Sequence, residues 1–251
     1  MKFSIITIAY NNENEIAQTI ESVINQTYSN IEYIIVDGAS KDNTLEVIKK
    51  YKNRISKIIS EPDKGIYDAI NKGIKAATGD VVGLIHSGDE LFDNTVIEKI
   101  VNHFKKYKID ALYGHSKIYS QDGNKVVRIN KSPEYKDNLF RRGWFPSHQS
   151  FYAKRELFEN FGYYNPKYKI AADYELLLRF LYINKSKVSL LNEYIVKFKL
   201  GGTSTSSVKN IILLNKECIA AWKDNNLKIP FYTIPLKLFR KIIQVVKAKV
   251  N

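Results

Sequence analysis

The chain has 251 residues, of which 44% are hydrophobic, and it can therefore bury the core of one large domain with an appendage. A net charge of +13 means that an anionic partner or surface must be considered, and nucleic acid, an acidic membrane surface and a phosphorylated small substrate all stay open on charge alone. The single cysteine, Cys218, excludes an internal disulfide, no apolar run approaches the roughly 20 residues that span a bilayer, and the four histidines lack the spacing of zinc ligands.

The first ninety residues alternate apolar runs of strand length with amphipathic helical patterns. Strands are expected at residues 3–8, 33–36, 55–59 and 80–85. Three helices are expected between them: one that bears Ile16, Ile20 and Val23 behind a cap at Asn11 or Asn12, one that opens at Asp42 or Asn43, and one at residues 66–77. Because the first strand lacks polar alternation, it should be covered on both faces, and the element order predicts a parallel, doubly wound α/β unit.

The stretch from Gly79 to Glu90 carries the fourth strand into a polar turn. The apolar run stops at His86, and Asp89 follows at the strand's carboxyl end, where ligands bind in open α/β sheets. A carboxylate on a Gly-containing turn is suited to hold a hard cation, so Asp89 is the first candidate metal ligand. The alternative is that Asp89 only caps a turn before a helix that begins near Asn94.

The other turns at this edge carry Tyr10, Glu15 and Asp37 in place of a phosphate loop. Neither G-x-G-x-x-G nor G-x-x-x-x-G-K-[ST] occurs, which argues against a nicotinamide dehydrogenase and a P-loop enzyme. A carboxylate that accepts from a nucleobase N–H, beside an aromatic ring that stacks on the base, suits a nucleoside pocket. Asp37 has a second interpretation as a turn residue that bonds its own backbone.

Beyond Asn94 strands outnumber helices. A helix bearing Val96 to Phe104 leads to a strand at 110–113, a hairpin-like pair at 117–119 and 125–129, and an irregular polar stretch at 136–143. Trp144 either stacks on a sugar ring or packs in the core, and His148 either lines a diphosphate or metal or is structural. Asp173 precedes an apolar helical stripe and by spacing alone caps that helix.

Two separated stretches resemble a known family, the family 2 glycosyltransferases with the GT-A fold. They read SIITIAYNNENEIAQTIESVINQTYSNIEYIIVDGASKDNT and EPDKGIYDAINKGIKAATGDVVGLIHSGDE. The resemblance covers roughly residues 1–205 and implies a Rossmann-like, mostly parallel sheet flanked by helices, with a nucleotide-sugar-binding half (1–93), a mixed acceptor-binding half (94–205) and a C-terminal helical extension (206–251). One departure stands out, because Ser87 occupies the place of the first Asp of the family's D-x-D motif.

The resemblance also implies roles for individual residues. Asp173, within AADYELLLR, corresponds to the family's general base, and Gly201 to Ser204 correspond to a segment that covers the donor. The metal is assigned to Asp89 and His148, and the acceptor to Trp144, His148 and Glu175. The donor is assigned to Ile8, Tyr10, Glu15, Asp37, Lys64, Asp68, Asn71, Ser87 and Gly88.

These assignments predict an inverting enzyme that moves a sugar from a UDP- or GDP-sugar to a saccharide or lipid-linked acceptor, in the synthesis of cell-surface polysaccharide. Mn²⁺ or Mg²⁺ is the expected cofactor, because the ligands are oxygens. A nucleotidyltransferase is the first alternative, although residues 9–14 form no Gly-rich phosphate loop. A basic nucleic-acid-binding module is the second, and since no nucleic-acid motif is present we expect no such partner.

The C-terminal part is predicted to be helical, at 208–222 and again after Pro235. In the tail Leu236, Phe239, Ile243 and Val246 share one face, and basic residues occupy the others, as in a helix at a membrane interface. Two outcomes stay open: contact with an anionic membrane surface, or packing on the protein's own core or on a second subunit of a homodimer. The N-terminus has no signal-peptide pattern, so we expect a cytoplasmic protein, peripheral on the membrane if the tail binds it.

Overall fold

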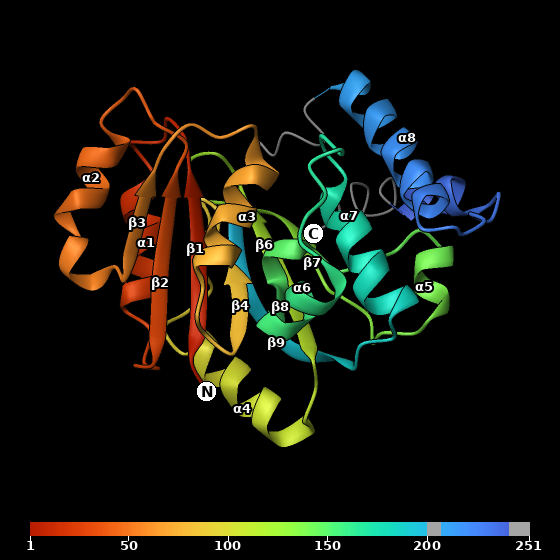
Figure 1. Ribbon diagram of the computed structural model, residues 1–251, viewed down its shortest axis with the longest axis horizontal. Coiled ribbons are helices and arrows are strands. Elements are labelled where there is room, and N and C mark those ends of the chain that lie inside the picture. The colour runs from red at the N-terminus through yellow and green to blue at the C-terminus, as the bar shows by residue number, and fades with distance from the viewer. Residues whose placement is uncertain (200–206, 241–251) are drawn as a thin grey trace.

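The structure, a computed structural model, describes residues 1–199 and 207–240. Its N-terminal half consists of β1 (Phe3–Ala9), α1 (Ile16–Ile24), β2 (Ile31–Asp37), α2 (Thr44–Lys50), the 3-10 helix η1 (Lys52–Arg54), β3 (Lys57–Ser60), α3 (Ile66–Ala76) and β4 (Val81–Leu84). The four strands are parallel in the order β3-β2-β1-β4, and their carboxyl ends meet at the top of Figure 1. The predicted parallel, doubly wound unit is confirmed.

The second half extends the same sheet with mixed pairing. It comprises β5 (Glu90–Leu91), α4 (Val96–Tyr107), β6 (Ala111–Tyr119), β7 (Val126–Asn130), α5 (Asn138–Arg141), the 3-10 helix η2 (His148–Ser150), β8 (Phe151–Lys154), α6 (Arg155–Phe161), α7 (Ala172–Leu177), the π-helix η3 (Leu178–Ile183), β9 (Val188–Lys199) and α8 (Val208–Asp224). β8 lies antiparallel to β4, and β6 lies antiparallel to β8 but parallel to β9. The mixed strand pairing of this half is as expected, but the expected excess of strands over helices is wrong, because the helices α4 to α8 outnumber the strands β6 to β9 in the described residues after Asn94.

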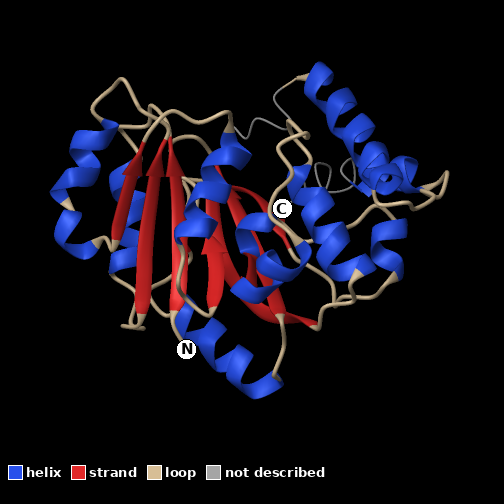
Figure 2. Ribbon diagram, in the orientation of Figure 1, coloured by secondary structure: helices blue, strands red, loops and turns tan. Residues whose placement is uncertain are grey.

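Helices cover both faces of the sheet (Figure 2). Ile6 of β1 packs in one core cluster with Ile70 of α3, while Ile5 packs in the other cluster with Ile20 of α1. Successive side chains of a strand point to opposite faces, so a strand that is covered twice needs apolar residues at both. The unbroken apolar run of β1 follows from this position.

Three local expectations are wrong. The strand expected at 110–113 and the first strand of the expected hairpin are one strand, β6, because its parallel pairing with β9 resumes at His115 after a shift in register at Gly114, where the Ile195 side chain fills the place of a Cβ. The irregular stretch at 136–143 contains α5. Neither Asn11 nor Asn12 caps α1 with its side chain; the Asn12 carbonyl oxygen accepts from Ile16 N instead.

The chain after α8 returns to the body and is helical from residue 233 to the end of the described range at 240. Thr233 is buried and donates from Oγ1 to the carbonyl oxygen of Arg141 at 2.6 Å. Leu236 is half-buried, whereas Phe239 is exposed, and the tail positions Ile243 and Val246 lie outside the described residues. Within residues 1–199 and 207–240, no helix has the length and apolar character needed to cross a membrane.

Candidate functional site

The carboxyl ends of β1 and β2 form the wall where a nucleobase was expected. Asp37 is fully buried, and its carboxylate accepts hydrogen bonds from Ser60 Oγ at 2.7 Å and from the backbone N–H and hydroxyl of Ser40. The Tyr10 ring is exposed and lies 3.2 Å from where a Cβ on Gly38 would sit. An open aromatic face thus stands beside a carboxylate that the two serines hold in place.

The turn after β4 is clamped to α1. Thr19 Oγ1 accepts from Gly88 N at 3.0 Å and donates to the carbonyl oxygen of Asp89 at 2.8 Å, while Ser87 N donates to the carbonyl oxygen of Ile8 at 3.1 Å. Gly88 has φ +96°, and Glu15 Oε2 lies 2.8 Å from the position of its missing Cβ. Both the backbone conformation and the space require glycine here.

Asp89 has an environment that is short of positive charge. Its Oδ2 accepts a hydrogen bond from Gln149 Nε2. Burial raises the pKa of this carboxyl well above its ordinary value, the carboxylates of Glu15 and Glu90 raise it further, and only the Lys199 ammonium opposes them. A divalent cation at Asp89 would relieve this repulsion, and oxygen ligands suit Mg²⁺ or Mn²⁺. In the described part of the chain no three His, Cys, Asp or Glu side chains are grouped to hold a metal, so most ligands would have to come from substrate and water.

Asp173 lies in the first turn of α7, but it is not the cap, because the N-cap residue is Ala171. Its Oδ2 lies 3.1 Å from His148 Nδ1, and its Oδ1 lies 3.5 Å from the hydroxyl of Tyr67, which donates to the carbonyl oxygen of Ile170 at 2.7 Å. The capping role that spacing predicted is therefore wrong. The carboxylate instead points at the side chains of two other elements.

His148 is in turn bonded to His86, since their Nε2 atoms are 2.8 Å apart. If His148 Nδ1–H donates to the Asp173 carboxylate, a neutral His148 must accept at Nε2, and His86 then donates from its own Nε2. Burial lowers the pKa of His86 to about 3, with a smaller effect from His148, so His86 is neutral at physiological pH. No described residue bonds the buried Nδ1 of His86, which agrees with that nitrogen carrying no proton.

One turn connects the two carboxylates. His148 and Gln149 are consecutive residues of η2, and the first bonds Asp173 while the second bonds Asp89. β8, which follows η2 directly, pairs with β4, so the turn is fixed to the strand that carries His86 and Asp89. The structure thus brings together the candidate base and the candidate metal ligand.

Other predicted site residues are held in structural contacts. Asn71 bonds the backbone of Tyr164 through both ends of its amide, at 2.7 and 3.0 Å. Asp68 accepts from Lys64 N at 3.0 Å, and Trp144 is half-buried with its ring 5.6 Å from that of Tyr113. These contacts leave the Lys64 side chain, but not the Asn71 amide, available to a donor.

Glu175 lies in the interior, only 4% exposed, and the structure corrects its assignment to the acceptor. Its Oε2 pairs with Arg179 at 2.8 Å, and its Oε1 accepts from Arg179 Nε at 3.0 Å and from Asn225 Nδ2 at 3.2 Å. Arg179 also donates to the carbonyl oxygens of Gly162 and Tyr163. Glu175 thus holds the Arg179 side chain, which in turn bonds the backbone of the loop between α6 and α7.

The sequence prediction missed four contributors: His86, Gln149, Thr19 and Tyr67. His86 stands directly after a buried strand, a position that signals a ligand edge, and Gln149 is the neighbour of a residue already chosen. Thr19 and Tyr67 are helix residues whose roles arise from tertiary packing. The donor-covering segment expected at Gly201 to Ser204 lies outside the described residues.

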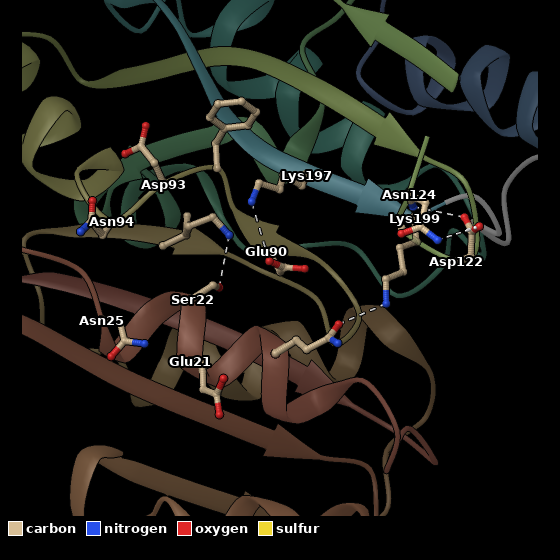
Figure 3. Close-up of a pocket in the computed structure, with 14 residues that line it drawn as sticks. Glu21, Ser22, Asn25, Glu90, Asp93, Asn94, Asp122, Asn124, Lys197 and Lys199 are labelled. Atoms are coloured by element: carbon tan, nitrogen blue, oxygen red, sulfur yellow. Dashed lines mark hydrogen bonds and ion pairs between the residues drawn. The ribbon is translucent and has the colours of Figure 1, made fainter. Parts of the chain in front are cut away.

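A separate cavity of about 480 Å³ begins beside Asp89, at Glu90 (Figure 3). It is lined by residues of α1, β5, β9 and the β6–β7 turn, and Glu90 and Lys197, which are paired on the adjacent strands β5 and β9, lie 3.9 Å apart in its wall. None of the predicted site residues lines it. Lys199, at its edge, reaches Glu15 at 2.9 Å and so borders both the cavity and the candidate site.

Comparison with known proteins is consistent with this site. The family model described as "Glycosyl transferase family 2" matches residues 4–170. The chondroitin synthase of Pasteurella multocida (strain Pm70) is 30% identical over 211 residues, which are 83% of this chain and 21% of that protein. The chain therefore spans about a fifth of that relative's length.

Solved structures share the fold at lower identity. S. aureus TarS in complex with UDP-GlcNAc matches 91% of this chain and 68% of that chain, with a TM-score of 0.71 and 20% identity. The mannosyltransferase PcManGT from Pyrobaculum calidifontis, in complex with GDP-Man and Mn²⁺, matches 99% of this chain and 73% of that chain, with a TM-score of 0.66 and 15% identity. The predicted α/β fold of the GT-A class is confirmed.

Proposed function

This chain belongs to glycosyltransferase family 2, and we propose that it is an inverting enzyme that transfers a sugar from a nucleotide diphosphate sugar to a saccharide or lipid-linked acceptor. A role in cell-surface polysaccharide synthesis follows from this acceptor class. One observation carries the proposal: the carboxylates of Asp89 and Asp173 are held by adjacent residues of one turn, Gln149 and His148. Inversion requires a base and a stabilised leaving group on opposite sides of the reacting carbon, and a turn that contacts two separate carboxylates supports such an arrangement.

Asp173 serves as the general base. Its carboxylate takes the proton of the acceptor hydroxyl as that oxygen attacks the anomeric carbon, and the bond from that carbon to the diphosphate breaks in the same displacement. The electron pair of the broken bond leaves with the diphosphate. His148 Nδ1, at 3.1 Å, orients the carboxylate, and His86 holds the far side of the His148 ring.

Asp89 would hold the divalent cation, whose charge would stabilise the departing diphosphate. The shortage of positive charge around Asp89 supports this role, and Mn²⁺ is present in the PcManGT complex. Ser87 and Gly88 lie beside the diphosphate. His148 remains a further candidate ligand, although binding a metal would require one of its ring nitrogens to give up a hydrogen bond.

Tyr10 and Asp37 bind the base of the donor, with Ile8, Glu15, Lys64 and Asp68 around it. The donor is a UDP- or GDP-sugar; the two structural neighbours, one in complex with UDP-GlcNAc and the other with GDP-Man, support both bases. Trp144 and His148 face the acceptor. A lipid-linked acceptor would place the enzyme beside an anionic membrane surface. The basic tail would contribute to binding that surface.

A thermal-shift screen of UDP- and GDP-sugars, with and without Mn²⁺, tests the donor assignment. We expect one sugar nucleotide to raise Tm, and to raise it more with the metal, because a ligand that binds only the folded state stabilises it by mass action. Turnover should release a nucleoside diphosphate and a product of inverted anomeric configuration, read by NMR. Release of pyrophosphate instead would identify a nucleotidyltransferase, and retention of configuration would contradict the single displacement.

A further inference from the structure

The outer face of α8 carries an apolar stripe. Val208, Ile212 and Ile219 are 74%, 52% and 45% exposed. At about 100° per residue, their spacing places them within roughly 40° of one another around the helix. The helix buries a neighbouring side, centred about 100° away around the axis, through Cys218, Ala221 and Trp222.

A row of lysines runs beside this stripe. Lys209, Lys216 and Lys223 are exposed, and their seven-residue spacing keeps them on one line along α8, next to the apolar residues. Among residues 1–199 and 207–240 none of the three forms an ion pair with a carboxylate, although Lys223 helps to lower the pKa of the neighbouring Asp224, after the larger effect of Lys167. Long lysine side chains on such a helix can place their stems over apolar groups and their charges in a polar layer.

The acidic residues of α8 are turned the other way. Glu217 accepts from the backbone N–H groups of Lys169, Ile170 and Ala171, each at 2.9 Å, and Asp224 pairs with Lys167 at 2.8 Å. The outer face therefore keeps most of its positive charge, with only Lys223 close to an acidic residue, Asp224. The contact through Glu217 also attaches α8 to the segment that enters α7, two to four residues before Asp173.

The chain after α8 adds exposed apolar groups at the same end of the molecule. Phe231 is 91% exposed and Phe239 is 59% exposed. Lys237 Nζ lies 3.0 Å from Cys218 Sγ, so the helical residues 233–240 lie against α8, as Figure 1 also shows. α4 lies at the other end of the molecule in the same view.

We propose that the outer face of α8 is a docking surface for an anionic lipid bilayer. The apolar stripe enters the headgroup layer, and the three lysines contact lipid phosphates; an apolar stripe flanked by unpaired cations has this interfacial pattern, whereas nucleic acid would need the charge alone. The proposal rests on the proposed function for its purpose, since docking through α8 would hold Asp173 near a lipid-linked acceptor.

The test is sedimentation of the full chain with vesicles of phosphatidylcholine that contain phosphatidylglycerol, without nucleotide sugar. The variant Lys209→Gln/Lys216→Gln/Lys223→Gln should bind about a hundredfold more weakly, because each basic residue near an anionic surface contributes about fivefold. Val208→Ser/Ile212→Ser/Ile219→Ser should also weaken binding. Lys105→Gln/Lys106→Gln/Lys108→Gln, at the end of α4, makes the same change in net charge at exposed positions and should keep wild-type binding.

Each outcome of the vesicle-binding test either supports or overturns the proposed docking surface. Equal binding of the α8 variants and the wild type would overturn the proposal and leave the tail, which is intact in every variant, as the membrane contact. If light scattering finds a dimer that the α8 variants dissociate while vesicle binding is unchanged, the face is a subunit interface and the proposal is wrong. Donor binding by thermal shift is measured separately: its absence would contradict the proposed function but not the docking surface.

Discussion

His148 Nδ1 lies 3.1 Å from Asp173 Oδ2, and this bond sets the direction of the carboxylate that we propose as the general base. The exposed fractions of the two side chains are only 21% and 16%, so water competes weakly for the contact. The second ring nitrogen of His148 is held by His86. The Asp173 carboxylate is thus oriented through two imidazole rings. Substitutions at Asp173 and at His86 should therefore have separate effects.

Asp173→Asn should lower turnover by about 10²- to 10⁴-fold, because a general base typically supplies that factor. Donor affinity should stay close to that of the wild type, since Asp173 contacts neither Asp37 nor Asp89. The fold should also persist, because Asp173 is not the cap of α7. Turnover and donor Kd measured on the same preparation check this. A variant that transfers sugar at the normal rate would remove Asp173 from the mechanism.

Asp89→Asn should nearly abolish transfer and weaken Mn²⁺-dependent donor binding, measured by calorimetric titration. The control is Asp93→Asn, which makes the same chemical change at a partly exposed aspartate paired with Lys99 at 3.0 Å. An unchanged metal titration in Asp89→Asn would exclude Asp89 as a ligand.

Asp89→Asn should also stabilise the metal-free protein at neutral pH. The pKa of Asp89 in the folded state is raised, so the folded state favours the protonated carboxyl. The stability that this protonated form provides is lost as the pH rises from the unfolded-state pKa toward the folded-state pKa. Asparagine has no proton to lose. The Tm difference between variant and wild type should therefore be positive at pH 7 and shrink toward pH 4. A lower Tm for the variant at both pH values would contradict the direction of the pKa shift.

His86→Gln should make the protein less sensitive to acid. Burial lowers the pKa of His86 from 6.5 to about 3, so between these values the unfolded chain binds a proton that the folded protein does not. Wild-type stability should fall as the pH drops below 6.5, by at most about 1.4 kcal/mol per pH unit from this residue. Urea unfolding at pH 7 and pH 5 measures the slope. Equal slopes for wild type and variant would show that His86 charges freely in the folded state.

Gly88→Ala should destabilise the protein more than Gly123→Ala. Both glycines have positive φ, +96° and +77°, so both substitutions carry the backbone cost of about 1–2 kcal/mol. Only at Gly88 would the new methyl group meet another atom, Glu15 Oε2 at 2.8 Å, whereas no atom lies within 4 Å at Gly123. The difference in unfolding free energy between the two variants isolates that crowding. A difference near zero would mean that Glu15 moves aside without cost.

The sequence predicts those parts of the site that depend on neighbouring residues in the chain. Asp37 and Asp89 end apolar runs, and a strand's end places its side chain at the ligand edge regardless of what packs there. The pair of His86 and His148 could not be predicted, because the two residues are 62 positions apart and meet only when β8 pairs with β4. Glu175 could have been recognised as structural, since Arg179 stands one helical turn later.

The Asn71 amide, which closes two hydrogen bonds on the backbone of Tyr164, has a further effect on how the molecule opens. Tyr67, one turn earlier on α3, stacks on Tyr164 with ring centroids 5.7 Å apart. The loop between α6 and α7 is therefore fastened to a helix of the other half of the chain. Local unfolding of α3 must release this loop, which leads to Asp173. The two segments should therefore exchange their amide protons as one cooperative unit.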